Sequence, residues 1–245
     1  MRNVTVFGGS GRVGARIVMA LRLSGHTVTS ASPSTGVDAI TGHGVREALA
    51  GADVVIDATN APQGSAAGTL DFFTQASRNI LDAGTRAGVK HHVLLSVVGA
   101  DRLTGSPYMR AKVAQEAFVR AAAIPWTIVR ATQFFEFVEQ FPELFREGET
   151  VKLPMGWTQP LRAEDAAAML ADVALEPARR RIVELGGPDA RPIADFVRIV
   201  LARRGESRPV VADPEVLYFG ARLSNDTLLP GPGARLSTIR YEDLA

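Results

Sequence analysis

Short runs of apolar, β-forming residues alternate with longer segments that carry apolar residues at helical spacing along most of this chain. Such runs are typical of buried strands, because turn residues bound them and they are too short for stable helices. We expect strands at residues 4–7, 26–31, 51–57, 89–96, 125–130 and 181–185. We expect helices at residues 15–23, 44–50, 70–87 and 193–204, with another opening at residue 106 and an alanine-rich one ending at residue 175. This alternation predicts an α/β fold with a doubly wound parallel sheet and helices on both faces.

The first predicted strand ends in a cluster of glycines. Gly8, Gly11 and Gly14 follow a G-x-x-G-x-x-G spacing between a strand and a helix. The first glycine permits a tight turn, the second lets the backbone approach a pyrophosphate, and the third lets the helix pack closely on the strand. The helix N-terminus offers free N–H groups to the phosphates. We predict a dinucleotide site rather than an ordinary turn, with further contacts from Ser10, Arg12 and Val13.

The segment after the second strand bears on the choice of cofactor. An acidic residue there prefers the free 2′-hydroxyl of NAD(H), and a basic residue accommodates the 2′-phosphate of NADP(H). This chain has neither, but Ser30, Ser32, Ser34 and Thr35 instead. Hydroxyls bond a phosphate without repelling it, and Arg12 adds charge, so the pattern favours NADP(H) with NAD(H) as the alternative. The alternative interpretation is that this segment is an ordinary turn that binds no ligand.

Further polar residues lie where the predicted strands end. Thr59 and Asn60 follow the buried strand at 51–57, on the sheet edge where ligands bind in such folds, or they belong to a polar loop without a ligand. His91 and His92 stand at the entrance of the next strand, and we expect them to face solvent. No carboxylate or third histidine accompanies them at ligand spacing, so we predict no metal site.

A tyrosine and a lysine share one face of the helix that opens at residue 106. Tyr108 and Lys112 are four residues apart. A phenol needs a pKa shift of ~3 units to act as an acid or base near neutral pH. A lysine cation at ~4 Å supplies about that much. Ser96, at the end of the preceding strand, is a candidate to hold a substrate oxygen, or simply a hydroxyl that ends a strand.

These motifs resemble the short-chain dehydrogenase/reductase superfamily, in its atypical NmrA-like, NAD(P)H-binding branch. The resemblance covers the first ~135 residues. It rests on residues 8–14, the strand end at 94–99, the Tyr108–Lys112 pair and residues 125–130.

The resemblance implies a Rossmann fold with NAD(P) at the strand tips. It also implies a tyrosine acid/base, a lysine that binds the nicotinamide ribose and lowers the tyrosine pKa, and a residue that orients the carbonyl. By motif these are Tyr108, Lys112 and Ser96. The family's usual arginine after the second strand is missing. Many members of the branch lack the tyrosine and act as cofactor-level sensors, so its presence argues for activity.

The C-terminal half carries aromatic residues that suit an apolar pocket. We expect residues 131–160 and 188–245 to form a small substrate-binding portion of one NAD(P)-binding domain that spans 1–245, with residues 150–159 as an edge strand or lid. The alternative for the phenylalanines is a helix packed on the core. The pocket candidates are Gln133, Phe134, Phe135 and Trp157.

Composition narrows the class of protein. The chain has 245 residues, no cysteine and a formal net charge of +1, which argues against disulfides, a thiol nucleophile and a nucleic-acid or membrane partner. We expect a cytoplasmic protein, monomeric or homodimeric, that binds a small molecule.

Together these features predict an NAD(P)H-dependent oxidoreductase that moves hydride to or from a small apolar carbonyl, enone or quinone. One alternative is a non-catalytic redox sensor that binds NAD(P). Another is a sugar-nucleotide epimerase or dehydratase, which is disfavoured because little chain remains for a sugar-nucleotide domain.

Overall fold

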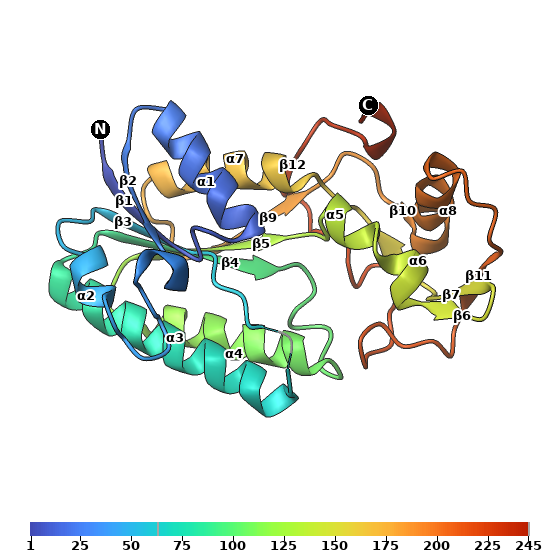
Figure 1. The fold of residues 1–245 in the computed structure, drawn as a ribbon, viewed down its shortest axis with the longest axis horizontal. Coiled ribbons are helices and arrows are strands. Elements are labelled where there is room, and N and C mark those ends of the chain that lie inside the picture. Colours follow the sequence, from blue (N-terminus) through green and yellow to red (C-terminus); the bar gives the residue numbers. More distant parts are fainter. Residues whose placement is uncertain (63, 245) are drawn as a thin grey trace.

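Seven parallel strands form the central sheet of the protein, in the order β12-β9-β5-β4-β3-β1-β2 (Figure 1). The strands are β1 (Asn3–Phe7), β2 (Thr27–Ala31), β3 (Val54–Asp57), β4 (His91–Val97), β5 (Trp126–Ala131), β9 (Ile182–Gly186) and β12 (Arg235–Leu236). The computed structural model describes residues 1–62 and 64–244. Gln63 and Ala245, the last residue of the expected substrate-side portion, lie outside the described residues. The predicted doubly wound α/β fold is confirmed.

Helices cover both faces of this sheet. On one face α1 (Arg12–Leu23) packs beside α7 (Ala163–Leu175), and on the other α3 (Ala66–Ala87) packs beside α4 (Pro107–Ala121), with the short α2 (Val45–Ala48) nearby (Figure 1). The helix α3 ends at Gly88, whose φ of 72° suits glycine. It begins earlier than its apolar spacing predicts, because the Ser65 hydroxyl accepts from the Gly68 amide and caps it.

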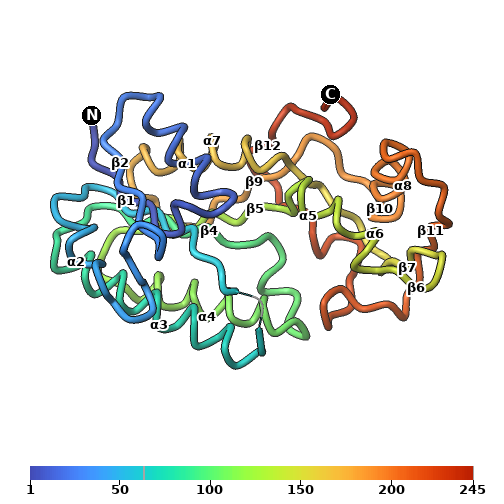
Figure 2. Tube along the Cα trace, in the orientation of Figure 1, coloured from blue at the N-terminus to red at the C-terminus, as the bar shows by residue number. Residues whose placement is uncertain are grey.

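Several smaller elements gather beyond the C-terminal ends of β4 and β5, as the two traces show (Figures 1 and 2). They bury an apolar cluster of their own, separate from the two clusters on the faces of the main sheet. We call this part the C-terminal lobe. It contains α5 (Phe135–Val138), α6 (Phe141–Leu144), α8 (Ile193–Arg203), the sheet of β6 (Arg146–Glu147), β7 (Thr150–Pro154) and β11 (Val210–Asp213), and the pair β8 (Trp157–Thr158) and β10 (Arg191–Pro192). Within the described ranges, no helix has the length and apolar character needed to cross a membrane.

The expectation that His91 and His92 face solvent is wrong. Both are buried, at 3% and 1% exposure, because β4 lies in the middle of the sheet with helices over both faces. The His91 Nε2 atom contacts the Thr127 hydroxyl at 2.9 Å. Neither ring nitrogen of His92 has a hydrogen-bond partner among the described residues, and burial lowers its pKa to about 4.

Replacing His92 with leucine is expected to reduce the loss of unfolding free energy as the pH falls. The unfolded chain binds the proton near the ordinary pKa of 6.5, well before the folded chain does as the pH falls. The wild type should therefore lose roughly 2 kcal/mol of unfolding free energy from this group between about pH 7.5 and pH 5. Urea unfolding across that range checks this, with the exposed His43→Leu as control. Equal acid slopes for wild type and His92→Leu would contradict it.

Candidate nucleotide-binding and catalytic site

The C-terminal ends of β1 and β3 meet where the strand order changes direction. After β1 the chain adds β2 on one side and β3 on the other, which makes this edge the switch point where α/β sheets bind ligands. The turn after β1 lies directly against the loop after β3. Gly8 has a φ of +73°, and a Cβ there would lie 2.6 Å from the Ala58 carbonyl oxygen. Only glycine permits this contact.

The close packing expected at Gly14 is present. A Cβ on Gly14 would lie 2.1 Å from the Gly8 carbonyl oxygen. The first turn of α1 therefore packs against the glycine turn so closely that only a residue without a side chain fits. Gly9, to which the spacing assigns no role, is also constrained, because a Cβ there would lie 2.4 Å from the Ser30 hydroxyl. Gly11 is the N-cap residue of α1. No side chain of the described residues accepts a hydrogen bond from the first backbone amides of this helix. This end of α1 suits an anionic ligand.

Hydroxyls gather directly after β2, as the sequence suggests. Ser32 is 4% exposed and precedes a 3-10 turn at Pro33–Thr35. Its hydroxyl lies 3.0 Å from that of Ser34, and its amide donates to the Thr35 hydroxyl at 3.0 Å. Arg12, in the glycine turn, is exposed. The segment thus offers hydroxyls and no carboxylate beside the end of β2.

Tyr108 reaches the loop after β3 from the first turn of α4. Its hydroxyl donates to Asn60 Oδ1 at 3.0 Å, and its ring packs edge-on against Phe73 with centroids 5.9 Å apart. Burial raises its pKa to about 12. A phenol that exchanges protons near neutral pH needs a lowered pKa, so this shift is in the opposite direction. The Lys112 ammonium does not contribute to the pKa shift of Tyr108.

Lys112 extends into the core beneath α4 and is 2% exposed. Its ammonium donates to the Leu95 carbonyl oxygen at 2.8 Å and to Gln115 Oε1, and lies 4.6 Å from the centre of the Phe73 ring. Burial lowers its pKa to about 8, although Asp57 and Glu116 oppose that shift. The ring of Phe73 therefore contacts both Tyr108 and Lys112.

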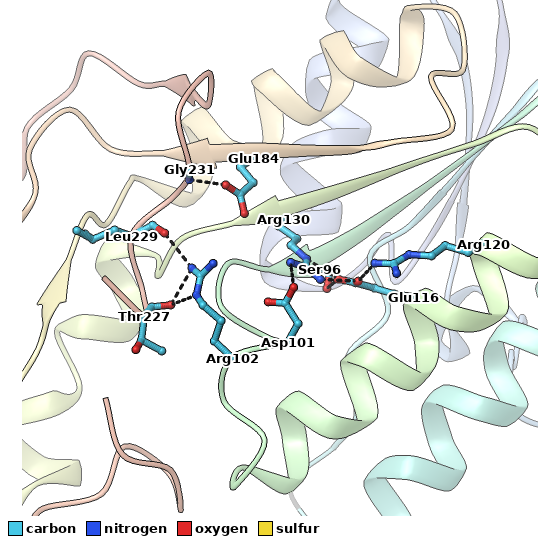
Figure 3. A network of polar contacts seen from close by, with 10 residues as sticks. All are labelled: Ser96, Asp101, Arg102, Glu116, Arg120, Arg130, Glu184, Thr227, Leu229 and Gly231. Atoms are coloured by element: carbon cyan, nitrogen blue, oxygen red, sulfur yellow. Dashed lines mark hydrogen bonds and ion pairs between the residues drawn. The ribbon is translucent and has the colours of Figure 1, made fainter. Parts of the chain in front are cut away.

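Ser96 faces a buried ion pair (Figure 3). Its hydroxyl donates to Glu116 Oε1 at 2.7 Å, and the Arg130 guanidinium donates to both oxygens of the same carboxylate at 2.8 Å. Burial opposes charge on Arg130, but its hydrogen bonds with Glu116 and Asp101 raise its pKa, so it stays cationic. In the described part of the chain, the hydrogen bonds of Ser96 do not include one with Tyr108. The predicted catalytic set is therefore brought together only in part.

The loop after β4 holds the C-terminal segment, a contact that the sequence did not suggest. Arg102 donates to the carbonyl oxygens of Thr227 and Leu229, each at 3.0 Å through Nη2 (Figure 3). A Cβ on Gly99 would lie 2.2 Å from the Thr227 oxygen. The tail is thereby held against the loop between β4 and α4.

The four pocket candidates occupy different environments. Gln133 is 5% exposed and accepts from the Thr158 hydroxyl at 3.1 Å, while its Nε2 has no partner among the described residues. Phe134 packs against the core of the main sheet. Phe135 stacks on Phe196 in the lobe, which favours the alternative of a core residue. Trp157 is 40% exposed.

Within the described residues there is no group of three His, Asp or Glu side chains that could hold a metal ion. The fold and the glycine turn instead define a dinucleotide-binding α/β protein. A family described as NAD(P)H-binding matches residues 8–177, more than half of the chain. The chain belongs to this family.

Curated relatives match part of their own length. Divinyl chlorophyllide a 8-vinyl-reductase of Arabidopsis thaliana is 28% identical over 149 residues, which are 56% of this chain and 36% of that protein. The photosystem II assembly factor Ycf39 of Cyanophora paradoxa is 20% identical over 171 residues, 68% of this chain and 53% of that protein. The chain thus spans between about a third and a half of these relatives.

Solved structures share the fold at low identity. A short-chain dehydrogenase/reductase superfamily protein of Agrobacterium tumefaciens with bound NAD has a TM-score of 0.68 and 20% identity, over 86% of this chain and 85% of that one. An NADPH-dependent quinone oxidoreductase of Escherichia coli has a TM-score of 0.65 and 17% identity, over 86% and 78%. The expected NAD(P)H-binding family is confirmed, and the chain shares the fold of the short-chain dehydrogenase/reductase protein.

Replacing Gly14 with alanine is expected to damage both the fold and nucleotide binding. The added methyl group would collide with the Gly8 carbonyl, and such overpacking costs about 1–3 kcal/mol of unfolding free energy. Displacing the turn should also weaken NADPH binding by about tenfold or more, which is ~1.4 kcal/mol. Denaturant unfolding and calorimetric titration measure the two effects. The control is Gly68→Ala, whose methyl group meets only the Ser65 hydroxyl, at 3.3 Å. Wild-type NADPH affinity in Gly14→Ala would refute the assignment.

Proposed function

We propose that this protein is an NAD(P)H-dependent oxidoreductase that moves hydride to or from a small, fairly apolar carbonyl, enone or quinone. The observation that carries the proposal is the hydrogen bond from the Tyr108 hydroxyl to Asn60. Asn60 belongs to the loop that contacts the glycine turn, so the Tyr108 hydroxyl would lie close to a nucleotide bound on that turn. Family membership supports the nucleotide.

The residues present fit a nicotinamide dinucleotide. The turn at residues 8–14 and the first amides of α1 would hold the pyrophosphate, since three close backbone contacts there admit only glycine. When bound, the nicotinamide supplies or accepts the hydride. Tyr108 gives its hydroxyl proton to the substrate oxygen in the reductive direction and takes it back in the oxidative one. Lys112 supplies the positive charge on the same helix.

NADP(H) is the favoured form of the cofactor. The hydroxyls of Ser32, Ser34 and Thr35 lie together after β2, and no carboxylate accompanies them in that segment. An anionic 2′-phosphate would find donors there without a repelling charge, and the exposed Arg12 adds a cation from the glycine turn.

The substrate would lie between the glycine turn and the C-terminal lobe, within the substrate-side portion at residues 131–160 and 188–245. The Nε2 donor of Gln133 is buried and has no partner among the described residues, so it suits a carbonyl oxygen. Because the Ser96 hydroxyl donates its hydrogen bond to Glu116, we assign the role of orienting the substrate carbonyl to Gln133 and a supporting role to Ser96. The vinyl reductase and quinone oxidoreductase among the similar proteins support a conjugated, apolar substrate.

A non-catalytic NAD(P)-binding sensor is the second candidate. Two observations favour it: the raised pKa of Tyr108 and the hydrogen bond of Ser96 to Glu116. The similarity to an assembly factor supports it as well. A sensor needs the glycine turn but not the phenol, and this difference separates the two candidates.

Replacing Tyr108 with phenylalanine is expected to abolish turnover while leaving nucleotide affinity within about threefold. The phenol supplies a proton-transfer step worth about 10²–10⁴ in rate and contributes little to binding the pyrophosphate. NADPH oxidation with a panel of carbonyls, enones and quinones, together with NADPH titration, tests this. The control is Tyr241→Phe, because the Tyr241 hydroxyl bonds Glu139. Unchanged turnover in Tyr108→Phe would contradict the acid/base role of Tyr108, and no turnover by the wild type would favour the sensor.

Replacing Ser32 with aspartate is expected to reverse the nucleotide preference. Aspartate suits the capping position that Ser32 occupies, so the turn should persist. Its carboxylate would repel the 2′-phosphate and accept from a free ribose hydroxyl. NADPH affinity should fall by about tenfold or more, ~1.4 kcal/mol, while NADH affinity holds or rises. Paired titrations measure this, with the exposed Ser207→Asp as control. An unchanged NADPH to NADH ratio would place the 2′-position elsewhere.

A further inference from the structure

A continuous set of buried polar contacts runs beneath α4. Asp57 is 1% exposed, Lys112 2% and Gln115 0%. Gln115 joins the other two, because its Oε1 accepts from the Lys112 ammonium and its Nε2 donates to Asp57 Oδ2 at 3.1 Å. The lysine and the carboxylate are thereby linked through one amide.

The same carboxylate organises the loop after β3. Asp57 Oδ1 accepts from the Thr59 amide at 3.0 Å and from the Thr59 hydroxyl at 2.7 Å. Thr59 directly precedes Asn60, the acceptor for the Tyr108 hydroxyl. The helix α4 is therefore connected to this loop by two routes, one through Tyr108 and one through Gln115.

The chemistry of the three groups explains why an amide stands at position 115. An ammonium only donates hydrogen bonds and a carboxylate only accepts them, so the residue between them must accept at one end and donate at the other. Glutamine does both without adding charge. The charged groups that influence Lys112 are Asp57 from β3 and Glu116 from α4, and its other contacts are the Leu95 carbonyl and the Phe73 ring.

We propose that Gln115 is a positioning residue that holds the Lys112 ammonium in place and couples its charge, through Asp57, to the loop at residues 57–60. Its importance for catalysis rests on the proposed function, in which Lys112 supplies positive charge on the helix that carries the reacting phenol. The role in placing the lysine rests on the contacts alone. Gln115 touches neither substrate nor cofactor in this account and acts through Lys112.

The pKa of Lys112 can be read directly, because the chain has only three lysines, Lys90, Lys112 and Lys152. We would label the full chain with ¹⁵N-lysine and follow the three side-chain nitrogens by NMR as the pH is varied. Replacing Gln115 with methionine keeps its length and removes the acceptor, which disfavours the charged form. The Lys112 pKa should fall by about one to two units, as expected for a lost hydrogen bond to a charged group.

Two further variants make the result interpretable. Gln115→Glu keeps the acceptor for the ammonium and loses the donor to Asp57, so the Lys112 pKa should lie above that of Gln115→Met. Gln140→Met is the matched control, because Gln140 bonds only a backbone carbonyl on the exposed side of the lobe. It should move none of the three resonances. A Lys112 pKa that is the same in wild type, Gln115→Met and Gln115→Glu would overturn the proposal.

The pH dependence of kcat/KM tests the link to catalysis. If protonated Lys112 assists Tyr108, the alkaline limb of the profile moves to lower pH in Gln115→Met by the same shift that NMR records. A limb that stays in place while the lysine titration moves would refute the positioning role in catalysis. Absence of turnover in the wild type would refute the proposed function, whereas the NMR titration would still decide whether Gln115 places the lysine.

Discussion

The contact between α1 and the turn after β1 is the constraint on which the candidate site depends. Gly14 lies so close to the Gly8 carbonyl that no side chain fits between them, and Gly8 itself contacts the Ala58 carbonyl. These approaches bring the first amides of α1 beside the loop after β3. That loop then lies within reach of Tyr108. The glycine turn and the acid/base candidate therefore share one backbone arrangement.

Buried charge fixes the helix that carries Tyr108. Lys112 and Glu116 both lie beneath α4, and their partners come from the strands below it, Asp57 on β3 and Arg130 on β5. Burying charges costs desolvation energy, so such groups are a poor source of stability but a good source of specific geometry. Loss of one partner would leave another buried charge uncompensated. This polar layer therefore ties α4 to β3 and β5.

The sequence predicted those features that depend on local pattern. The glycine spacing located the turn after β1, and Gly88 located the end of α3, because each position needs a backbone that other residues rarely adopt. Residue spacing also placed Tyr108 and Lys112 on one helix, but it could not show that the ammonium bonds Leu95 and Gln115 instead of reaching the phenol.

The features that the sequence could not show depend on tertiary packing. His91 and His92 look polar in sequence, yet β4 is covered on both faces. The partner of Ser96 is twenty residues away on α4, and Phe135 packs on Phe196 from a distant helix. The contacts of Arg102 with the tail span more than a hundred residues. No local spacing indicates such pairings. An arginine in a loop, such as Arg102, and an acid within a predicted helix, such as Glu116, are the signals in the sequence that would justify looking for them.

The most direct test of the central claim is a crystal structure of the protein bound to NADPH. We expect the pyrophosphate to lie on the turn at residues 8–14 and the 2′-phosphate to lie beside Ser32. We expect the nicotinamide ring to lie next to Tyr108, whose hydroxyl then faces the substrate position. A nucleotide bound away from the glycine turn, or a nicotinamide ring turned away from Tyr108, would contradict the account.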